Sequence, residues 1–333
     1  MPTRTPTTRL SVDMAPLEAL PLLRAAAERL QPYARRTPTV HANWLSEATG
    51  MEVHLKLENL QRTGAFKIRG ALNKVLSLAP AELARGVVTA STGNHGAAVG
   101  FALRSVGARA TVFVPERASP TKLAAIARQG GEIRRHGVDS GETEIFARAH
   151  AEATGAVWIS PYNDPLVIGG QGTAGVELLR QVPDLDAVFV SLGGGGLIGG
   201  IGAWLKAHAP ATRVIACSPV NSAVMMRSVE AGRILTLDSL PTLSDGTAGG
   251  VEPGSITFDL VRAVVDEHVA VDEDEIAAAM RDTMEAHHMM VEGAAGVAVA
   301  GFRRQAARWS GARVAIVLCG ANVSLSTLKS ILP

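Results

Sequence analysis

The chain has 333 residues, of which 47 % are hydrophobic and 19 % charged, and its 32 Lys and Arg nearly balance its 31 Asp and Glu. This composition argues against a disordered chain and against a nucleic-acid-binding protein, which would carry a basic excess. No apolar run reaches the roughly 18–20 residues of a membrane-spanning helix, and the Thr-rich N-terminus lacks a signal-peptide pattern. We therefore expect a cytoplasmic protein with no membrane or nucleic-acid partner. The two cysteines, Cys217 and Cys319, are too few for a cysteine-based zinc site.

Short apolar runs alternate with helical patterns along most of the chain, which predicts an α/β fold with parallel βαβ units. In chain order, the predicted strands are residues 52–58, 87–91, 110–114, 156–159, 187–192, 213–217 and 313–318. The predicted helices are residues 65–78, 97–106, 120–129, 142–154, 172–181, 274–287 and 294–309, with a further helix that begins near Leu197. At roughly 150 residues per domain, the length favours two domains. We expect a small domain of residues 85–160 inserted into a large domain of residues 1–84 and 161–333.

Lys67 lies after the first predicted strand in the segment Gly64-Ala65-Phe66-Lys67-Ile68-Arg69-Gly70, and it is one of only six lysines in the chain. A lysine in the first turn of a helix is ordinarily a surface residue. At this position, however, the positive end of the helix dipole disfavours the cation and would lower the pKa of the amine. Schiff-base chemistry needs an amine of this kind.

The segment Ser91-Thr92-Gly93-Asn94-His95-Gly96 follows the second predicted strand and precedes a helix. A strand-to-helix turn rich in hydroxyl, amide and backbone N–H groups favours a carboxylate-binding site. The alternative is an ordinary helix start, with Ser91 or Asn94 as the N-cap residue. The sequence leaves both interpretations open.

Four consecutive glycines, residues 193–196, connect the strand at 187–192 to the next helix. Their N–H groups and the following helix N-terminus are typical of a phosphate-binding loop, whereas a merely flexible loop here would cost stability without a benefit. Residues 194–199 also match the dinucleotide-binding pattern G-x-G-x-x-G. That pattern requires an acidic residue roughly 20 positions later, but the next strand ends in Cys217-Ser218-Pro219. An NAD-dependent oxidoreductase is therefore the weaker alternative.

Three other segments carry weaker signals. Arg134-Arg135-His136 is interpreted as a solvated turn, and His287-His288 cannot face one metal ion together because they are adjacent on a helix. Residues 242–250 are rich in hydroxyl groups and glycine and are interpreted as a loop that could line a site.

Together, the lysine segment, the 91–96 turn and the tetraglycine loop resemble the fold-type II pyridoxal-phosphate enzymes, and within them the serine/threonine dehydratase family, which includes serine racemase. The similarity covers nearly the whole chain from about Leu17. The sequence of the 91–96 turn and the Cys217-Ser218-Pro219 stretch are most like the branch of phenylserine and hydroxyectoine-utilisation dehydratases. It implies a fold like that of tryptophan synthase β, with two open, twisted, mainly parallel sheets. It also implies a homodimer that acts on a small amino acid with pyridoxal 5'-phosphate as cofactor.

The reaction implied by the resemblance is β-elimination from a β-hydroxy amino acid such as threonine or serine, which yields a 2-oxo acid and ammonia. Racemisation is the alternative within the family, and a non-catalytic amino-acid sensor on the same scaffold would not need Lys67. The chain ends at Pro333, so we expect no C-terminal regulatory domain.

The resemblance also implies roles for individual residues. Lys67 would bind the cofactor covalently and move the substrate's Cα proton, and Phe66 would pack beside the cofactor. Asn94 would bond the pyridine 3-hydroxyl, and the tetraglycine loop would bind the phosphate through Gly193, Gly194, Gly195 and Gly196. Gly246 would border the ring, Glu292 matches an acidic position near it, and Cys319 stands where many dehydratases have a serine facing the pyridine nitrogen. The substrate carboxylate would be bound by Ser91, Thr92, Gly93, Asn94 and His95.

Some positions depart from the family pattern. The metal-using relatives have two acidic residues where this chain has Ser218 and Val224, so we expect no divalent-cation site. Thr92 replaces a serine that serves racemases as the second acid, and its methyl group restricts χ1. Because Cys319 is neutral, we expect a largely unprotonated pyridine nitrogen, which suits elimination better than transamination.

Overall fold

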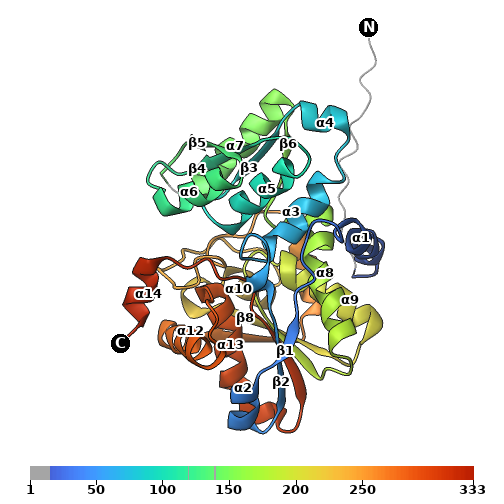
Figure 1. Ribbon diagram of the computed structural model, residues 1–333, viewed down its shortest axis with the longest axis vertical. Helices are drawn as coiled ribbons and strands as arrows, with labels where there is room; N and C mark the ends of the chain where they lie inside the picture. The colour runs from blue at the N-terminus through green and yellow to red at the C-terminus, as the bar shows by residue number, and fades with distance from the viewer. Residues whose placement is uncertain (1–15, 119, 139) are drawn as a thin grey trace.

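The computed structural model of the chain describes residues 16–118, 120–138 and 140–333, and two β-sheets lie one above the other in this part of the chain (Figure 1). The larger sheet has the order β1 (Thr39–His41), β2 (Glu52–Lys56), β10 (Arg313–Val317), β7 (Ala187–Ser191), β8 (Arg213–Pro219) and β9 (Glu267–Val271). The smaller sheet has the order β5 (Gly131–Arg135), β4 (Ala110–Val114), β3 (Val87–Ala90) and β6 (Val157–Trp158). Of the described strand pairs, β1 and β2 run antiparallel and the others are parallel. The predicted α/β class with mainly parallel sheets is confirmed.

The helices and short 3-10 turns connect and cover these strands. Those up to the end of the smaller sheet are α1 (Pro16–Arg29), α2 (Asn43–Thr49), η1 (Glu58–Leu60), α3 (Lys67–Val75), α4 (Pro80–Ala84), α5 (Asn94–Arg104), α6 (Pro120–Arg128) and α7 (Ser140–Thr154). Those that follow are α8 (Pro165–Gln181), α9 (Gly196–His208), η2 (Val220–Ser222), α10 (Val224–Glu230), α11 (Ile256–Val264), α12 (Glu273–His287), α13 (Gly293–Gln305), η3 (Ala306–Trp309) and α14 (Leu325–Ile331). None of the described helices is long and apolar enough to cross a membrane.

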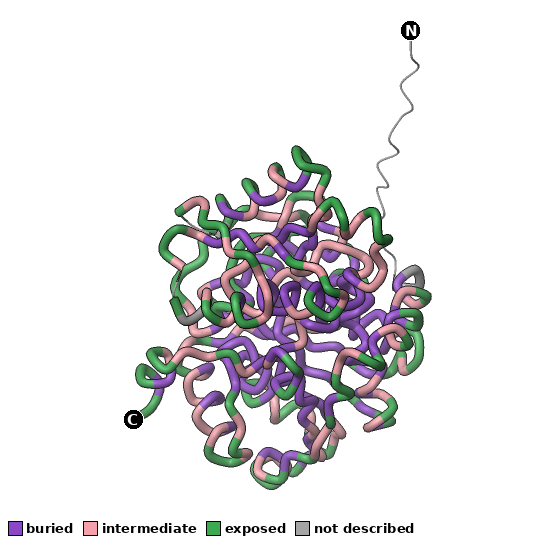
Figure 2. Tube along the Cα trace, turned by 45° about the horizontal axis from the view of Figure 1, so that its top comes forward, coloured by how far each residue is buried: buried purple, intermediate pink, exposed green. Residues whose placement is uncertain are grey.

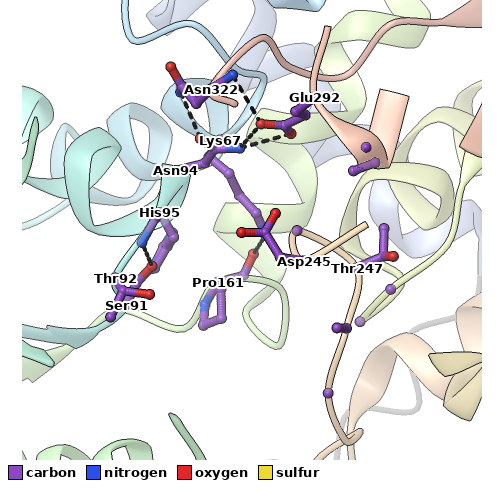
Figure 3. A pocket seen from close by; sticks show the side chains of 18 of the residues that line it. Lys67, Ser91, Thr92, Asn94, His95, Pro161, Asp245, Thr247, Glu292 and Asn322 are labelled. Carbon is purple, nitrogen blue, oxygen red and sulfur yellow. Dashed lines mark hydrogen bonds between the residues drawn. The ribbon is translucent and has the colours of Figure 1, made fainter. Parts of the chain in front are cut away.

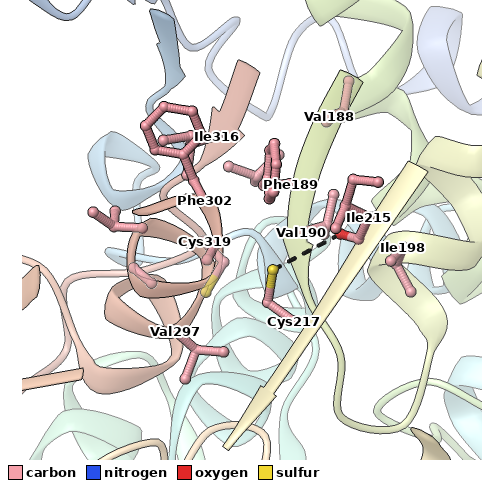
Figure 4. Close-up of a cluster of buried hydrophobic side chains, with 14 of the residues drawn as sticks. Val188, Phe189, Val190, Ile198, Ile215, Cys217, Val297, Phe302, Ile316 and Cys319 are labelled. Atoms are coloured by element: carbon pink, nitrogen blue, oxygen red, sulfur yellow. Dashed lines mark hydrogen bonds between the residues drawn. The ribbon is translucent and has the colours of Figure 1, made fainter. Parts of the chain in front are cut away.

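The larger sheet is covered on both faces, as a parallel sheet requires. Figure 1 shows α12 and α13 on one side of it and α8 and α9 on the other. All five residues of β7 are buried. Phe189 on this strand packs edge-to-face against Phe302 of α13, with 5.4 Å between ring centroids, and both side chains are fully buried (Figure 4). Each contributes about 1.5–3 kcal/mol through burial.

Buried residues concentrate in the middle of the molecule, and exposed residues lie at its periphery (Figure 2). One close contact beside the larger sheet needs a glycine: a Cβ at Gly301 of α13 would lie 2.4 Å from Cys217 Sγ on β8. The helix therefore packs directly onto the strand.

The segment Arg134-Arg135-His136 differs from its prediction as a turn, since Arg134 and Arg135 belong to β5. This strand is at the edge of the smaller sheet and has no fully buried residue, so it lacks the apolar run that marks an interior strand. The predicted helix at 172–181 begins earlier, at Pro165, where Asp164 caps it by accepting hydrogen bonds from two backbone N–H groups.

Candidate functional site

A cavity of about 1810 Å³ lies between the two sheets, at the carboxyl ends of β3 from the smaller sheet and of β7 and β10 from the larger one. This is the edge at which open α/β sheets bind ligands. Every predicted site residue lines the cavity, namely Phe66, Lys67, Ser91, Thr92, Gly93, Asn94, His95, Gly193, Gly194, Gly195, Gly196, Gly246, Glu292 and Cys319. Segments far apart in sequence meet here, such as those of Asn94 and Glu292, which are 198 positions apart, and those of Thr63 and Asn322, which are 259 positions apart.

Lys67 is the first residue of α3, and no side chain caps this helix. Its Nζ donates a hydrogen bond of 2.7 Å to the backbone oxygen of Pro161 (Figure 3). Burial lowers the pKa of Lys67 to about 8, although the nearby Cys319 and Glu292 oppose this shift. A substantial fraction of the amine is therefore neutral near physiological pH and available as a nucleophile or base.

The turn after β3 does not form an ordinary side-chain cap. Helix α5 begins at Asn94 with Gly93 in the N-cap position, and no side chain accepts a hydrogen bond there from the first turn. The interpretation of Ser91 or Asn94 as the N-cap is therefore wrong. Ser91 Oγ instead accepts a bond from the Gly93 N–H, and Thr92 lines the cavity. The N-terminal N–H groups of α5 remain free to bind a carboxylate.

His95 is buried directly behind this turn. Its Nε2 donates to the backbone oxygen of Ile159 at 3.0 Å, and burial lowers the pKa of His95 to about 3. The imidazole is therefore neutral at physiological pH. The hydrogen bond to Ile159 holds the His95 ring against the start of the segment that follows β6 and so anchors the turn.

The tetraglycine loop leaves no room for side chains. A Cβ would lie 2.9 Å from Thr247 Cα at Gly193, 2.5 Å from the Tyr162 ring at Gly194, and 2.5 Å from Gln171 Oε1 at Gly196. Gly195 has a φ of +87°, which other residues rarely adopt.

Helix α9 starts at the end of this loop, so its N-terminal N–H groups add positive potential. The loop is a backbone cradle of the kind that binds phosphate. Because it shares a cavity with an amine of lowered pKa, the residues present fit pyridoxal phosphate.

Glu292 lies just before α13 and is 4 % exposed. Its two carboxylate oxygens each lie 2.9 Å from Asn94 Nδ2, and Oε2 also accepts a bond of 3.2 Å from the Asn322 N–H. Burial raises the pKa of Glu292 to about 7 against the effect of these bonds. A Cβ at Gly320 would lie 2.4 Å from Glu292 Oε1, so the carboxyl group fits only beside a glycine.

Cys319 follows β10 and lies beside Glu292, with 3.9 Å between Sγ and Oε1. Ser191 Oγ donates to the same sulfur at 3.6 Å. Burial raises the pKa of the Cys319 thiol, so the group is uncharged. Gly246 borders the same region, where an added Cβ would lie 3.6 Å from Glu292 Oε1.

A buried ionic network lies behind Lys67. Arg69 of α3 is 1 % exposed and forms two-pronged pairs with the carboxylates of Glu58 and Glu177, with distances of 2.7–2.8 Å. Lys56 Nζ also donates to Glu177 Oε2 at 2.7 Å. The network links α3 to η1, β2 and α8 and so fixes the helix that carries Lys67.

Sequence reasoning missed several cavity residues. Pro161 supplies the oxygen that accepts the Lys67 hydrogen bond, Tyr162 packs beneath Gly194, and Asn322 bonds both Asn94 and Glu292. Asp245 was not missed in the same way, since it belongs to the 242–250 loop that the sequence indicated could line a site; it lines the cavity, and its charge contributes to the raised pKa of Glu292. The position of Asn322 just after Cys319 is the one signal that could have identified it.

The positions expected to lack metal ligands have other contacts. Ser218 Oγ donates to the backbone oxygen of Leu192 at 3.3 Å, and Val224 is buried at the start of α10. The described part of the chain holds no group of three or more His, Cys, Asp or Glu residues suited to a metal ion.

Comparison with known proteins agrees with this geometry. The chain is 40 % identical over 310 residues to the L-threonine ammonia-lyase of Thermotoga maritima, which covers 93 % of this chain and 77 % of that one. It is 38 % identical over 311 residues to the serine racemase of Arabidopsis thaliana, covering 92 % and 93 %. The processed form of threonine deaminase isoform 2 from Solanum lycopersicum superposes with a TM-score of 0.90 at 32 % identity, covering 95 % and 92 %. The family model described as pyridoxal-phosphate dependent enzyme matches residues 30–320, and the chain belongs to this family.

Proposed function

We propose that the chain is a pyridoxal-phosphate-dependent ammonia-lyase that removes the β-hydroxyl of threonine, serine or a related 3-hydroxy amino acid and releases a 2-oxo acid and ammonia. The observation that carries the proposal is the shared cavity of Lys67, whose pKa is lowered to about 8, and the tetraglycine cradle. The similarity to the L-threonine ammonia-lyase of Thermotoga maritima over 93 % of the chain supports it.

The chain's own residues divide the work between binding and proton transfer. The N–H groups of residues 193–196 would hold the cofactor phosphate, with Phe66 and Gly246 beside the ring. When bound, pyridoxal phosphate supplies an electron-withdrawing ring that acidifies the Cα proton of an amino acid. The N–H groups at the start of α5 hold the substrate carboxylate, together with Ser91 and Thr92. The Lys67 amine then accepts the Cα proton, and the Pro161 carbonyl orients that amine through their 2.7 Å hydrogen bond.

Elimination is proposed over racemisation for two reasons. The Cys319 thiol is buried and uncharged, so it would leave the pyridine nitrogen largely unprotonated. A ring in that state stabilises a carbanion poorly, which favours loss of the β-hydroxyl over reprotonation at Cα. Thr92 carries a hydroxyl but its β-branched side chain is restricted at χ1, which hinders delivery of a proton to the opposite face. The similarity to the serine racemase of Arabidopsis thaliana keeps racemisation as the second candidate.

Several finer features also belong to the proposal. We propose residues 85–160 as the small domain, which is supported by the four strands β3–β6 within that range. We also propose that the reaction needs no divalent cation. The proposal is supported by Val224, whose buried side chain is apolar, and by Ser218, whose hydroxyl donates to the Leu192 oxygen, because neither residue supplies a carboxylate ligand. The homodimer and the likeness to phenylserine and hydroxyectoine-utilisation dehydratases rest on the sequence resemblance alone, whereas the proposed cytoplasmic location rests on the composition and the N-terminal sequence pattern.

The test is a panel of L- and D-3-hydroxy amino acids, assayed for 2-oxo acid and ammonia beside chiral chromatography of the remaining substrate. We expect equal amounts of oxo acid and ammonia, with elimination faster than formation of the opposite isomer. Lys67→Ala should abolish the reaction. Lys206→Ala is the matched control, because Lys206 pairs with Asp266 and does not line the cavity. An opposite isomer that forms faster than oxo acid would identify a racemase instead.

A further inference from the structure

Asn322 joins three segments of the cavity wall. It lies three residues after Cys319, and its Nδ2 donates to Asn94 Oδ1 at 2.7 Å and to the backbone oxygen of Thr63 at 2.8 Å. Its own backbone N–H donates to Glu292 Oε2 at 3.2 Å. Asn322 therefore contacts the turn after β3, the segment that leads to Lys67, and the start of α13 (Figure 3).

These bonds allow the Asn94 amide only one orientation. Its nitrogen faces both oxygens of Glu292 at 2.9 Å, and its oxygen faces the Asn322 amide nitrogen. If the amide turned over, its NH₂ group would oppose the NH₂ group of Asn322, which the Thr63 oxygen holds in place, and its oxygen would oppose the ionised form of the Glu292 carboxylate. Both contacts would lose a hydrogen bond and add repulsion. A single N–H can lie between the two Glu292 oxygens, which leaves the second N–H of Asn94 available to a ligand in the cavity.

The segment that carries Asn322 is itself held against the Lys67 segment. The Ala321 N–H donates to the Gly64 oxygen at 2.8 Å, and the Phe66 N–H donates to the Cys319 oxygen at 3.0 Å. Gly64 has a φ of +75°, and a Cβ there would lie 2.7 Å from Asn322 Oδ1. The distance between the Lys67 segment and Asn94 is thus set through Asn322.

We propose that Asn322 is a positioning residue that orients the Asn94 amide so that an N–H, and not the oxygen, is presented to the cofactor. The inference rests on the proposed role of Asn94 in the function above. Asn322 acts through Asn94, so removing either side chain should remove the same interaction.

The test is a double-mutant cycle on cofactor affinity, measured by titrating the apoprotein with pyridoxal phosphate and following absorbance. Asn322→Ala and Asn94→Ala should each weaken binding by about threefold to tenfold, the effect of one hydrogen bond. The double variant should bind no more weakly than Asn94→Ala. The matched control is Asn43→Ala, which removes an amide oxygen that lies 2.7 Å from His41 Nδ1; neither residue lines the cavity, so this variant should leave affinity unchanged.

The proposal would be overturned if the affinity of the double variant were reduced by the product of the two single reductions. It would also be overturned if Asn322→Ala bound pyridoxal phosphate as tightly as the control variant. If Asn322→Ala does not fold, Asn322→Asp takes its place in the cycle. This variant keeps the shape but opposes Asn94 Oδ1 with a carboxylate, so it should weaken binding more than tenfold, and unchanged binding would refute the idea. No substrate enters these measurements, so a protein that binds the cofactor but releases no oxo acid would contradict the proposed function alone.

Discussion

Replacement of Gly194 by alanine should weaken cofactor binding by crowding the phosphate cradle. The added Cβ would lie 2.5 Å from Cδ1 and Cγ of Tyr162 and 2.8 Å from Cδ2. Carbon atoms in contact are ordinarily about 3.5–4.0 Å apart, so the loop and the ring must separate by about 1 Å. The Tyr162 hydroxyl is held by the Glu252 N–H at 3.0 Å, so we expect the loop to move. Such overpacking costs about 1–3 kcal/mol, which corresponds to about 5- to 150-fold weaker binding.

The assay is titration of the apoprotein with pyridoxal phosphate, together with thermal unfolding of the apoprotein. Gly250→Ala is the matched control, because Gly250 lines the same cavity but an added Cβ would meet no atom within 4 Å. Its affinity should equal that of the unmodified chain. Wild-type affinity in Gly194→Ala would refute the assignment of the tetraglycine loop as the phosphate cradle.

Three further predictions concern buried charges. Burial lowers the pKa of Lys67 to about 8. The rate at which the apoprotein binds the cofactor should therefore rise with pH to about 8 and then level off, because the neutral amine is the nucleophile. A rate that still rises near pH ~10 would contradict this prediction. Burial raises the pKa of Glu292 to about 7, so between pH about 4.5 and 7 the folded chain holds a proton that the unfolded chain has lost. The free energy of unfolding should fall across this interval, and Glu292→Gln should reduce the fall by about 3 kcal/mol in urea denaturation, whereas equal slopes would argue against a buried acid. Arg69→Met leaves the fully buried Glu58 without its cation and should lower the free energy of unfolding by about 3–5 kcal/mol. The double variant Arg69→Met/Glu58→Gln should recover part of this loss. An unchanged urea midpoint in Arg69→Met would show that the ion pair does not stabilise the fold.

The sequence was sufficient to predict the interior strands and the edge strand β6, predicted at 156–159 and found at Val157–Trp158, but not the other edge strands. Strand β7 is buried on both faces and therefore appears as a continuous apolar run, predicted at 187–192 and found at Ala187–Ser191. The unpredicted strands β1, β5 and β9 all lie at a sheet edge. They are partly exposed, so their residues do not form such a run.

The candidate site was predictable where its residues form short motifs. Lys67, the 91–96 turn and the tetraglycine loop could be recognised because each motif joins a strand end to a helix start. The hydrogen-bond partners of Asn322 and of the Pro161 carbonyl could not be predicted, because tertiary contacts alone set them. The hydrogen bond between Asn322 and Thr63, for example, spans 259 residues, and no periodic pattern signals it.

The central claim is that Lys67 carries the cofactor, and borohydride reduction of the holoenzyme tests it most directly. Reduction fixes a pyridoxyl group on the lysine that holds the cofactor, and digestion with mass spectrometry then locates it among the six lysines. We predict the label on the peptide that contains Lys67. A label on Lys56, Lys74, Lys122, Lys206 or Lys329 would contradict the account.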